Sequence, residues 1–276
     1  MTPDLHLFQI FYDDATRAAL DPDFQPLDNA RNERPDWFEF WPIHNHLQRQ
    51  PLEDDSYYGF FSPKFRDKTW LTGAKVRAFI AAQPGADVYT FSPTPDEACF
   101  YANVFEQGQS AHPGLVEVAQ AFFDEIKLGI DLRRIVMDVR TSVYANYFVA
   151  RGSFWRRWYG IFKSCHAHAE NPASPLHQRL CAVTRYHPPV QMKIFLMERV
   201  VSALLATTPG LKIVNYPPFE LPLGEKIWLP YFDNLVAMDA SKLAFLHTGD
   251  EIYMTAFRNT QKAVWNTLQR KFAQGK

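Results

Sequence analysis

Glycine is scarce in this chain, and the glycine-rich loops that cradle phosphates are absent. Twelve glycines are spread over 276 residues, and none forms a G-x-G-x-x-G or a G-x-x-x-x-G-K sequence. The G-x-S-x-G motif of α/β-hydrolases is missing as well. We therefore expect neither a kinase, a P-loop nucleotidase nor a conventional dinucleotide dehydrogenase, and no usual α/β-hydrolase.

Cysteine and long apolar runs are also in short supply. Cys99, Cys165 and Cys181 are odd in number and far apart, which argues against a disulfide framework and favours a reducing cytoplasm. No apolar run reaches the ~18 residues that a membrane span needs, and the N-terminus lacks the basic start of a signal peptide. We expect a cytoplasmic protein whose membrane contact, if it has any, is peripheral and at the inner face.

Charge of one sign is not concentrated anywhere. The 29 basic and 30 acidic side chains nearly cancel, and no stretch is dense in lysine or arginine. Nucleic acid is therefore not an expected partner. Hydrophobic residues make up 47% of the chain and aromatic residues 15%, which indicates a globular protein with a sizeable core.

Short apolar segments alternate with longer segments of helical periodicity. Strands are predicted at Leu5–Tyr12, Ser56–Phe61, Asp87–Phe91, Ser142–Val149 and Lys212–Tyr216. Helices are predicted at Asp36–Leu47, Gly73–Ala82, Gly114–Ile126, Ser153–His168 and Val190–Ala206, with one opening at Thr94 and a last one ending near Phe272. The alternation predicts an α/β fold, with a mostly parallel sheet flanked by helices. We assign residues 1–245 to one domain and residues 246–276 to its C-terminal helical extension.

Local signals mark where three of these helices begin. Thr72 is the expected N-cap of the helix at residues 73–82. Thr94 with Glu97, and Thr248 with Glu251, have the spacing of capping boxes, in which each side chain bonds the other's backbone amide.

The stretch YYGFFSPKFRDKTW runs a buried aromatic strand directly into three cations. Lys64, Arg66 and Lys68 follow the carboxyl end of the strand, which is where parallel sheets bind ligands. Cations at such a position favour an anion. The alternative interpretation is an ordinary solvated loop.

Two further segments carry polar side chains in unusual places. Glu106, Gln107 and His112 lie in what we expect to be a loop between two helices, where they would hold sugar hydroxyls or supply a base. A turn whose histidine caps a helix is the equally favoured alternative. Asn146 lies inside the apolar segment VYANYF, so its amide needs a partner, either a ligand or the backbone of a neighbouring loop.

The order of several segments resembles a known family. NARNERPDWFEFWPI is followed by DDSYYGFFSPKF, DVYTFSP, NYFVARGSFWRRWY and MKIFLMERVVSALL. This order resembles bacterial glycosyltransferase-like proteins of capsule and O-antigen gene clusters, which have a GT-A-type, Rossmann-like nucleotide-binding fold. The similarity runs from about Leu5 to Tyr216. It touches Asn32, Glu39, Tyr58, Gly59, Lys64, Asn146, Phe148, Glu198 and Arg199.

The resemblance implies a nucleotide-sugar donor that binds across the end of the first strand. Tyr12 and Asp13 would contact the base, and Asn32, Glu39 and Asn146 would contribute further donor contacts. Lys64 and Lys68, with Arg199, would neutralise the diphosphate. The only Asp-x-Asp sequence, Asp21–Asp23, comes too early in the chain to match the metal-binding motif common in GT-A enzymes, so we expect these cations to take the place of a metal ion.

For the acceptor side, a glycan or a lipid-linked glycan is expected, as part of a growing surface polysaccharide. Glu198, His112 and Asp87, in that order, are the candidate general bases, and Glu106 and Gln107 are the candidate acceptor contacts. A structural ion pair with Arg199 is the alternative role for Glu198. A non-catalytic glycan-binding or scaffold module is the alternative function. The final helix would pack on the domain, form a homo-oligomer or lie against a membrane-bound partner.

Overall fold

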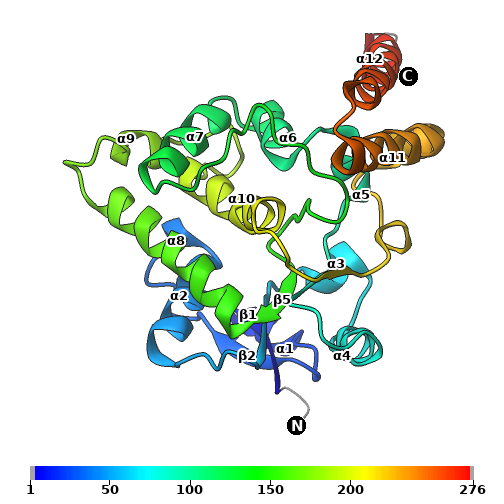
Figure 1. The fold of residues 1–276 in the computed structure, drawn as a ribbon. Helices are drawn as coiled ribbons and strands as arrows, with labels where there is room; N and C mark the ends of the chain where they lie inside the picture. The colour runs from blue at the N-terminus through cyan, green and yellow to red at the C-terminus, as the bar shows by residue number, and fades with distance from the viewer. Residues whose placement is uncertain (1–3, 274–276) are drawn as a thin grey trace.

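A computed structural model describes residues 4–273 of the chain, and it contains one six-stranded sheet (Figure 1). The strand order is β2-β1-β3-β5-β4-β6. The strands are β1 (Leu5–Phe11), β2 (Gln25–Asp28), β3 (Tyr57–Phe61), β4 (Val88–Thr90), β5 (Phe148–Arg151) and β6 (Ile213–Asn215).

Parallel pairing dominates this sheet. β1 pairs in parallel with β2 and β3, and β4 pairs in parallel with β6. β5 alone runs antiparallel, to both β3 and β4. The prediction of an α/β fold with a mostly parallel sheet flanked by helices is therefore confirmed. The carboxyl ends of β1, β3 and β4 and the amino end of β5 meet at one edge, which we call the carboxyl edge.

The largest group of helices lies on one face of the sheet and forms the larger core with it. This core joins the sheet residues Phe8, Phe60 and Phe148 to the tryptophans Trp155 and Trp158. The Trp155 indole donates to the carbonyl of Tyr58 at 2.7 Å, which ties the longest helix of this layer to β3. The layer contains α2 (Phe40–Arg49), α6 (Val104–Ala111), α7 (Leu115–Glu125), α8 (Gly152–Glu170) and α10 (Met192–Thr207).

A second, smaller core fills the opposite face. Leu7, Phe61 and Tyr89 pack there against Val76 and Ile80, which belong to α4 (Gly73–Ala82), and α3 (Phe65–Thr69) lies beside it. The Thr72 hydroxyl accepts the amide of Lys75 at 3.3 Å, so the predicted N-cap of α4 is confirmed.

The C-terminal part forms a third core of its own. It joins α5 (Pro95–Phe100), α11 (Phe232–Thr248) and α12 (Glu251–Ala273) through Phe100, Trp228, Leu235 and Phe257. Lys242 is fully buried there and donates to the carbonyls of Ala98, Tyr101 and Met137. The boundary drawn at 245/246 from the sequence falls inside α11, and α12 follows it as the last helix (Figure 1).

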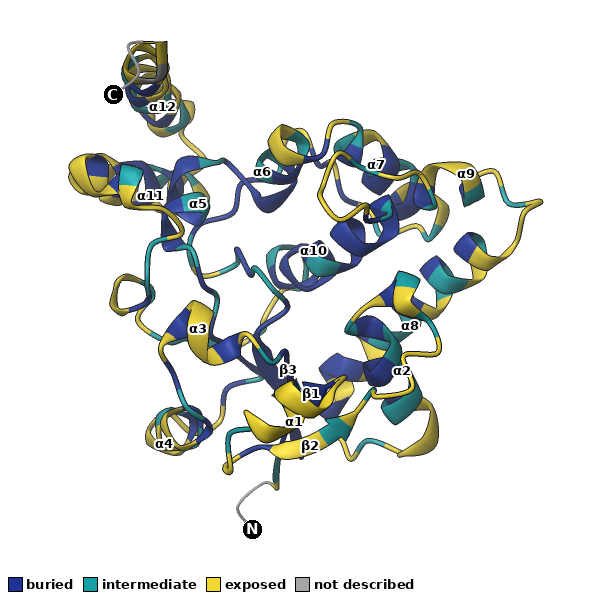
Figure 2. Ribbon diagram, turned by 180° about the vertical axis from the view of Figure 1, so that it is seen from behind, coloured by how far each residue is buried: buried dark blue, intermediate teal, exposed yellow. Residues whose placement is uncertain are grey.

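The remaining elements are short. None of the helices within residues 4–273 combines the length and the apolar character that crossing a bilayer requires. In Figure 2, α10 is buried along most of its length, whereas α4 and α11 present exposed outer faces. The short elements are α1 (Asp14–Ala18), α9 (His177–Leu180) and the 3-10 helices Pro35–Trp37, Pro218–Glu220 and Lys226–Tyr231.

Several local predictions were wrong. The strand expected at 142–149 begins only at Phe148, because Ala145 and Asn146 both have φ 56° and form a turn. Thr94 also has a positive φ (58°), and its side chain makes no capping bond, so α5 has no capping box. Thr248 is the last residue of α11, and Asp250 rather than Thr248 accepts the amide of Ile252.

Neither the edge strand β2 nor the helices α1, α3, α6, α9 and α11 were predicted from the sequence. The loop expected around Glu106 and Gln107 is in fact α6, whose N-cap Asn103 accepts the amides of Phe105 and Glu106.

Candidate functional site

The carboxyl edge of the sheet carries a side chain whose polar atoms have no partner. Asn146 is only 5% exposed, and neither its amide nitrogen nor its amide oxygen makes a hydrogen bond within the described residues. Its φ of 56° is a left-handed conformation that non-glycine residues rarely adopt. Buried polar side chains are normally paired, so Asn146 is a candidate ligand contact.

Tyr147 connects Asn146 to the end of β3. Its hydroxyl lies 2.5 Å from that of Ser62. Gly59 faces Val149 in the β3–β5 pairing, so Ser62 and Asn146 both lie just beyond the same end of this pair of strands. Lys68 lies 5.9 Å from the centre of the Tyr147 ring. Burial raises the pKa of the Tyr147 phenol, and the nearby carboxylates of Glu39 and Glu198 raise it further.

Two of the predicted cations reach this place because α3 begins immediately after β3. Lys64 is the residue before α3, and Lys68 lies one turn further, with its amide bonded to the Lys64 carbonyl at 3.0 Å. Both side chains are exposed, so they are free to bind an anion at the carboxyl edge. The sequence hypothesis of an anion site is consistent with this position.

Glu39 lies close enough to these cations to feel their charge. It stands just before α2 and caps no backbone amide. Protein surrounds its carboxyl while part of the residue stays open to solvent. This burial raises the pKa of Glu39 to about 7, although the charge of Lys68 and, more weakly, that of Lys64 act in the opposite direction. A carboxyl that titrates near neutrality is suited to general acid–base chemistry.

Glu198 on α10 is the second carboxylate of the group. Its side chain is 37% exposed, and one of its oxygens lies 3.7 Å from the Arg199 guanidinium. Burial raises the pKa of Glu198, while Arg199 and Lys68 oppose that rise. Lys68 therefore influences both carboxylates. We call Glu39, Lys64, Lys68 and Glu198 the carboxylate–lysine cluster.

Arg199 supports this cluster from inside the protein. It is 4% exposed, and its guanidinium donates to the carbonyls of Val104 and Phe195, each at 2.8 Å, and to the Gln107 amide oxygen at 2.7 Å. Because these donors are engaged, Arg199 orients Glu198 and Gln107 rather than reaching toward a diphosphate.

No protein-family model, curated protein or solved structure matches the chain. The resemblance to capsule and O-antigen glycosyltransferases therefore stays a prediction from the sequence. Function must be argued from the chemistry of the site, because α/β folds with a mostly parallel sheet serve many unrelated activities.

The other predicted residues of the donor site follow β1 and β2 at the same edge. Tyr12 follows β1 and is 42% exposed. Asp13 caps α1, and its carboxylate accepts the amide of Thr16 at 2.7 Å. Asn32 is an exposed loop residue with φ 41° that follows β2.

The structure does not bring the remaining predicted catalytic and acceptor residues to the cluster. Asp87 precedes β4 and so lies at the opposite edge, paired with Arg151 at 3.3 Å. Glu106 is held by Arg258 at 2.7 Å. His112 stacks on Phe195 at 3.5 Å, and burial lowers its pKa to about 4. Gln107 reaches the site only through Arg199.

Residues that the sequence gave no reason to select lie beside Arg199. Burial and the neighbouring Asp96 raise the pKa of Glu97 to about 7. The buried Tyr144 hydroxyl and one oxygen of Asp96 have no hydrogen-bond partner within the described chain. Glu97 was read as a capping residue and Tyr144 as part of a strand. Their shared neighbourhood was not visible, because it depends on where α10 packs.

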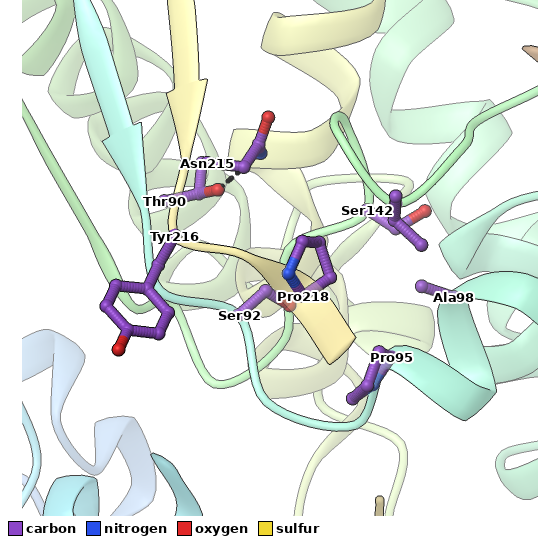
Figure 3. A pocket seen from close by; sticks show the side chains of 9 residues that line it. Thr90, Ser92, Pro95, Ala98, Ser142, Asn215, Tyr216 and Pro218 are labelled. Carbon is purple, nitrogen blue, oxygen red and sulfur yellow. Dashed lines mark hydrogen bonds between the residues drawn. The ribbon is translucent and has the colours of Figure 1, made fainter. Parts of the chain in front are cut away.

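A small cavity lies near the ends of β4 and β6 (Figure 3). Its volume is about 10 Å³, which is room for about one water molecule. Asn215 and Thr90 line it, and the Asn215 amide nitrogen donates to the Thr90 hydroxyl at 2.5 Å. This cavity is too small for a sugar, so we do not assign it a ligand.

Metal-binding side chains do not gather at the site. Within residues 4–273, no three His, Cys, Asp or Glu side chains are grouped so that they could hold a metal ion. Lys64 and Lys68 are positive charges that this edge offers to an anion.

Proposed function

We propose that the chain is a GT-A-like glycosyltransferase that moves a sugar from a nucleotide-sugar donor to a glycan of a bacterial surface polysaccharide. The observation that carries the proposal is the carboxylate–lysine cluster at the carboxyl edge, with the unpaired Asn146 beside it. Cations and carboxylates together meet the two needs of glycosyl transfer, which are a stabilised diphosphate and a proton acceptor.

In this proposal, Lys64 and Lys68 bind the diphosphate of the donor, and the Asn146 amide bonds the donor beside it. Glu198 or Glu39, in its ionised form, accepts the proton of the attacking acceptor hydroxyl. That oxygen forms a bond to the anomeric carbon of the donor sugar, while the bond from this carbon to the diphosphate oxygen breaks. The nucleoside diphosphate leaves with the bonding electrons, and the lysines stabilise its added charge.

Nucleotide binding tests the donor site. Isothermal titration with UDP-, GDP- and CMP-linked sugars is expected to show binding of one class. Because a charge-assisted hydrogen bond contributes about 1.5–3 kcal/mol, Lys64→Ala and Lys68→Ala should each weaken binding roughly 10-fold or more. Arg66→Ala is the matched control, since Arg66 is an exposed cation on the same helix. A folded protein that binds none of these nucleotides would overturn the proposal.

Donor hydrolysis separates transfer from simple binding. A slow release of nucleoside diphosphate that disappears in Lys68→Ala and Glu198→Gln supports an enzyme.

A non-catalytic glycan-binding module is the second candidate. Phe38, next to Glu39, is 43% exposed, and Trp70, two residues after Lys68, is 65% exposed. Exposed aromatic rings of this kind offer flat apolar faces to a sugar. Binding of oligosaccharides that is lost in Trp70→Ala, without any donor hydrolysis, would favour this candidate.

A further inference from the structure

A groove of about 460 Å³ lies beside α11 and α12, and none of its lining residues belongs to the carboxylate–lysine cluster. One wall is the segment around Arg133 and Arg134, which follows α7, and the other wall comes from the two C-terminal helices. Figure 1 shows α11 and α12 at one side of the molecule, next to α5 and α6. A volume of this size is typical of ligand sites.

Three arginines line the groove. Glu106 holds Arg258 in place with two hydrogen bonds, at 2.7 and 3.1 Å. Arg133 has only a distant ion pair with Glu117 at 3.9 Å, in which both side chains are more than half exposed, and such pairs contribute little. Within residues 4–273, Arg134 has no carboxylate partner. Two guanidinium groups are thus available to a phosphate, which their planar fork matches in geometry.

The rest of the lining is mixed, because Glu251, Thr255 and Asn259 lie in it beside apolar side chains. Ile135, Phe245 and Met254 contribute to the apolar part. Beside it, where α11 turns into α12, Leu246 is 45% and Ile252 61% exposed. Large apolar side chains exposed next to free cations are the pattern of a surface that meets both the headgroups and the acyl region of a bilayer.

The charge of α12 agrees with an anionic partner. Its sequence contains Arg258, Lys262, Arg270 and Lys271 against Glu251 as the single acidic residue. Glu251 lies in the first turn of the helix, where the positive end of the helix dipole offsets part of its charge. In a symmetric dimer, these cations of one copy would face the same cations of the other and repel them. An anionic lipid surface would attract them instead.

We propose that this corner of α11 and α12 docks on an anionic membrane. A lipid phosphate lies in the groove between Arg133 and Arg134, and Leu246 and Ile252 enter the interface. This inference stands independently of the donor site, because neither the groove nor the corner contains a residue of the cluster. Docking would hold the protein at a surface that carries lipid-linked molecules.

Co-sedimentation with vesicles tests the proposal. The wild-type protein should bind vesicles of phosphatidylcholine mixed with phosphatidylglycerol but not vesicles of phosphatidylcholine alone, and binding should weaken as salt is raised. Since each cation near such a surface contributes about 1 kcal/mol, Arg133→Gln with Arg134→Gln should weaken binding about 30-fold. Ile252→Asp should also weaken it. Arg49→Gln with Lys75→Gln, two exposed cations outside the groove, should change binding far less.

Four results would overturn the docking proposal. One is the absence of binding to the anionic vesicles. Another is equal loss in the control pair, since it would mean that only the overall charge matters. The third is binding of free inorganic phosphate or glycerol phosphate without vesicle binding, which would identify a small-molecule site. The fourth is a dimer of the wild-type protein, seen by light scattering and lost in Ile252→Asp, without vesicle binding. The corner would then bind a second copy of the chain instead of a membrane.

Discussion

Replacing Glu39 by glutamine should make the protein more stable and less active. Burial raises the pKa of this carboxyl from an ordinary 4.5 to about 7. The folded state therefore binds the proton more tightly than the unfolded state, so the folded chain loses stability as the pH rises from 4.5 to 7. At 1.36 kcal/mol per pKa unit, the ionised carboxyl costs about 3 kcal/mol above pH 7. Glutamine carries no charge and avoids this cost.

Unfolding in urea at several pH values measures the effect. Glu39→Gln should exceed the wild type in the free energy of unfolding by about 3 kcal/mol at pH 8 and by less than about 1 kcal/mol at pH 5. Because Glu97 and the other titrating groups remain in both proteins, the difference reports Glu39 together with its coupling to Glu198. Donor hydrolysis by the same variant should be slower. A residue that lowers the stability of the native protein is typically one that its activity needs.

The reasoning is refuted if Glu39→Gln destabilises the protein at pH 8, because Glu39 would then be a structural carboxylate. A difference that does not change with pH would also refute it, since the pKa of Glu39 would then be close to that in the unfolded chain.

Two further predictions concern the scaffold. Lys242→Met should lower the free energy of unfolding by roughly 3–5 kcal/mol, because the three carbonyls that accept from Lys242 would stay buried without a donor. An effect under about 1 kcal/mol in urea unfolding would contradict these hydrogen bonds. Gly152→Ala should lower the free energy of unfolding by about 1–3 kcal/mol, because its added Cβ would collide with the carbonyl of Glu53. Gly160→Ala on the same helix has nothing within 4 Å of the added Cβ. It should raise the free energy of unfolding by up to about 1 kcal/mol. Equal effects of the two alanines on the melting temperature would count against the close contact at Gly152.

The elements that could be predicted are those with local signals. α4 was predicted with the bounds that the structure has, because Thr72 caps it and its apolar residues recur at helical spacing. The segment 142–149 has the alternation of a strand, yet Ala145 and Asn146 turn the chain. Apolar alternation cannot distinguish these outcomes, since the left-handed turn at Asn146 depends on contacts with distant parts of the chain.

The candidate site shows the same division. The position of Lys64 and Lys68 was predictable, because they follow a strand directly and the carboxyl ends of parallel strands share an edge. The same rule, applied to Asp87, would have placed it at the opposite edge, since it precedes its strand. The neighbours of Glu39 were not predictable from local pattern, because Lys68 and Glu198 reach it from α3 and α10, which are far apart in sequence.

Costs in stability gather around the carboxyl edge, and they distinguish it from an ordinary solvated loop. Phe38 and Asn146 have a positive φ without being glycine, at about 1–3 kcal/mol each. Within residues 4–273, Asn146 adds two buried atoms without a hydrogen-bond partner, and Glu39 adds a carboxyl with a raised pKa. A loop that only solvates its charges needs none of these features. Their concentration beside Lys64 and Lys68 is what a ligand would compensate, and this is why we interpret the cations after β3 as part of a binding site.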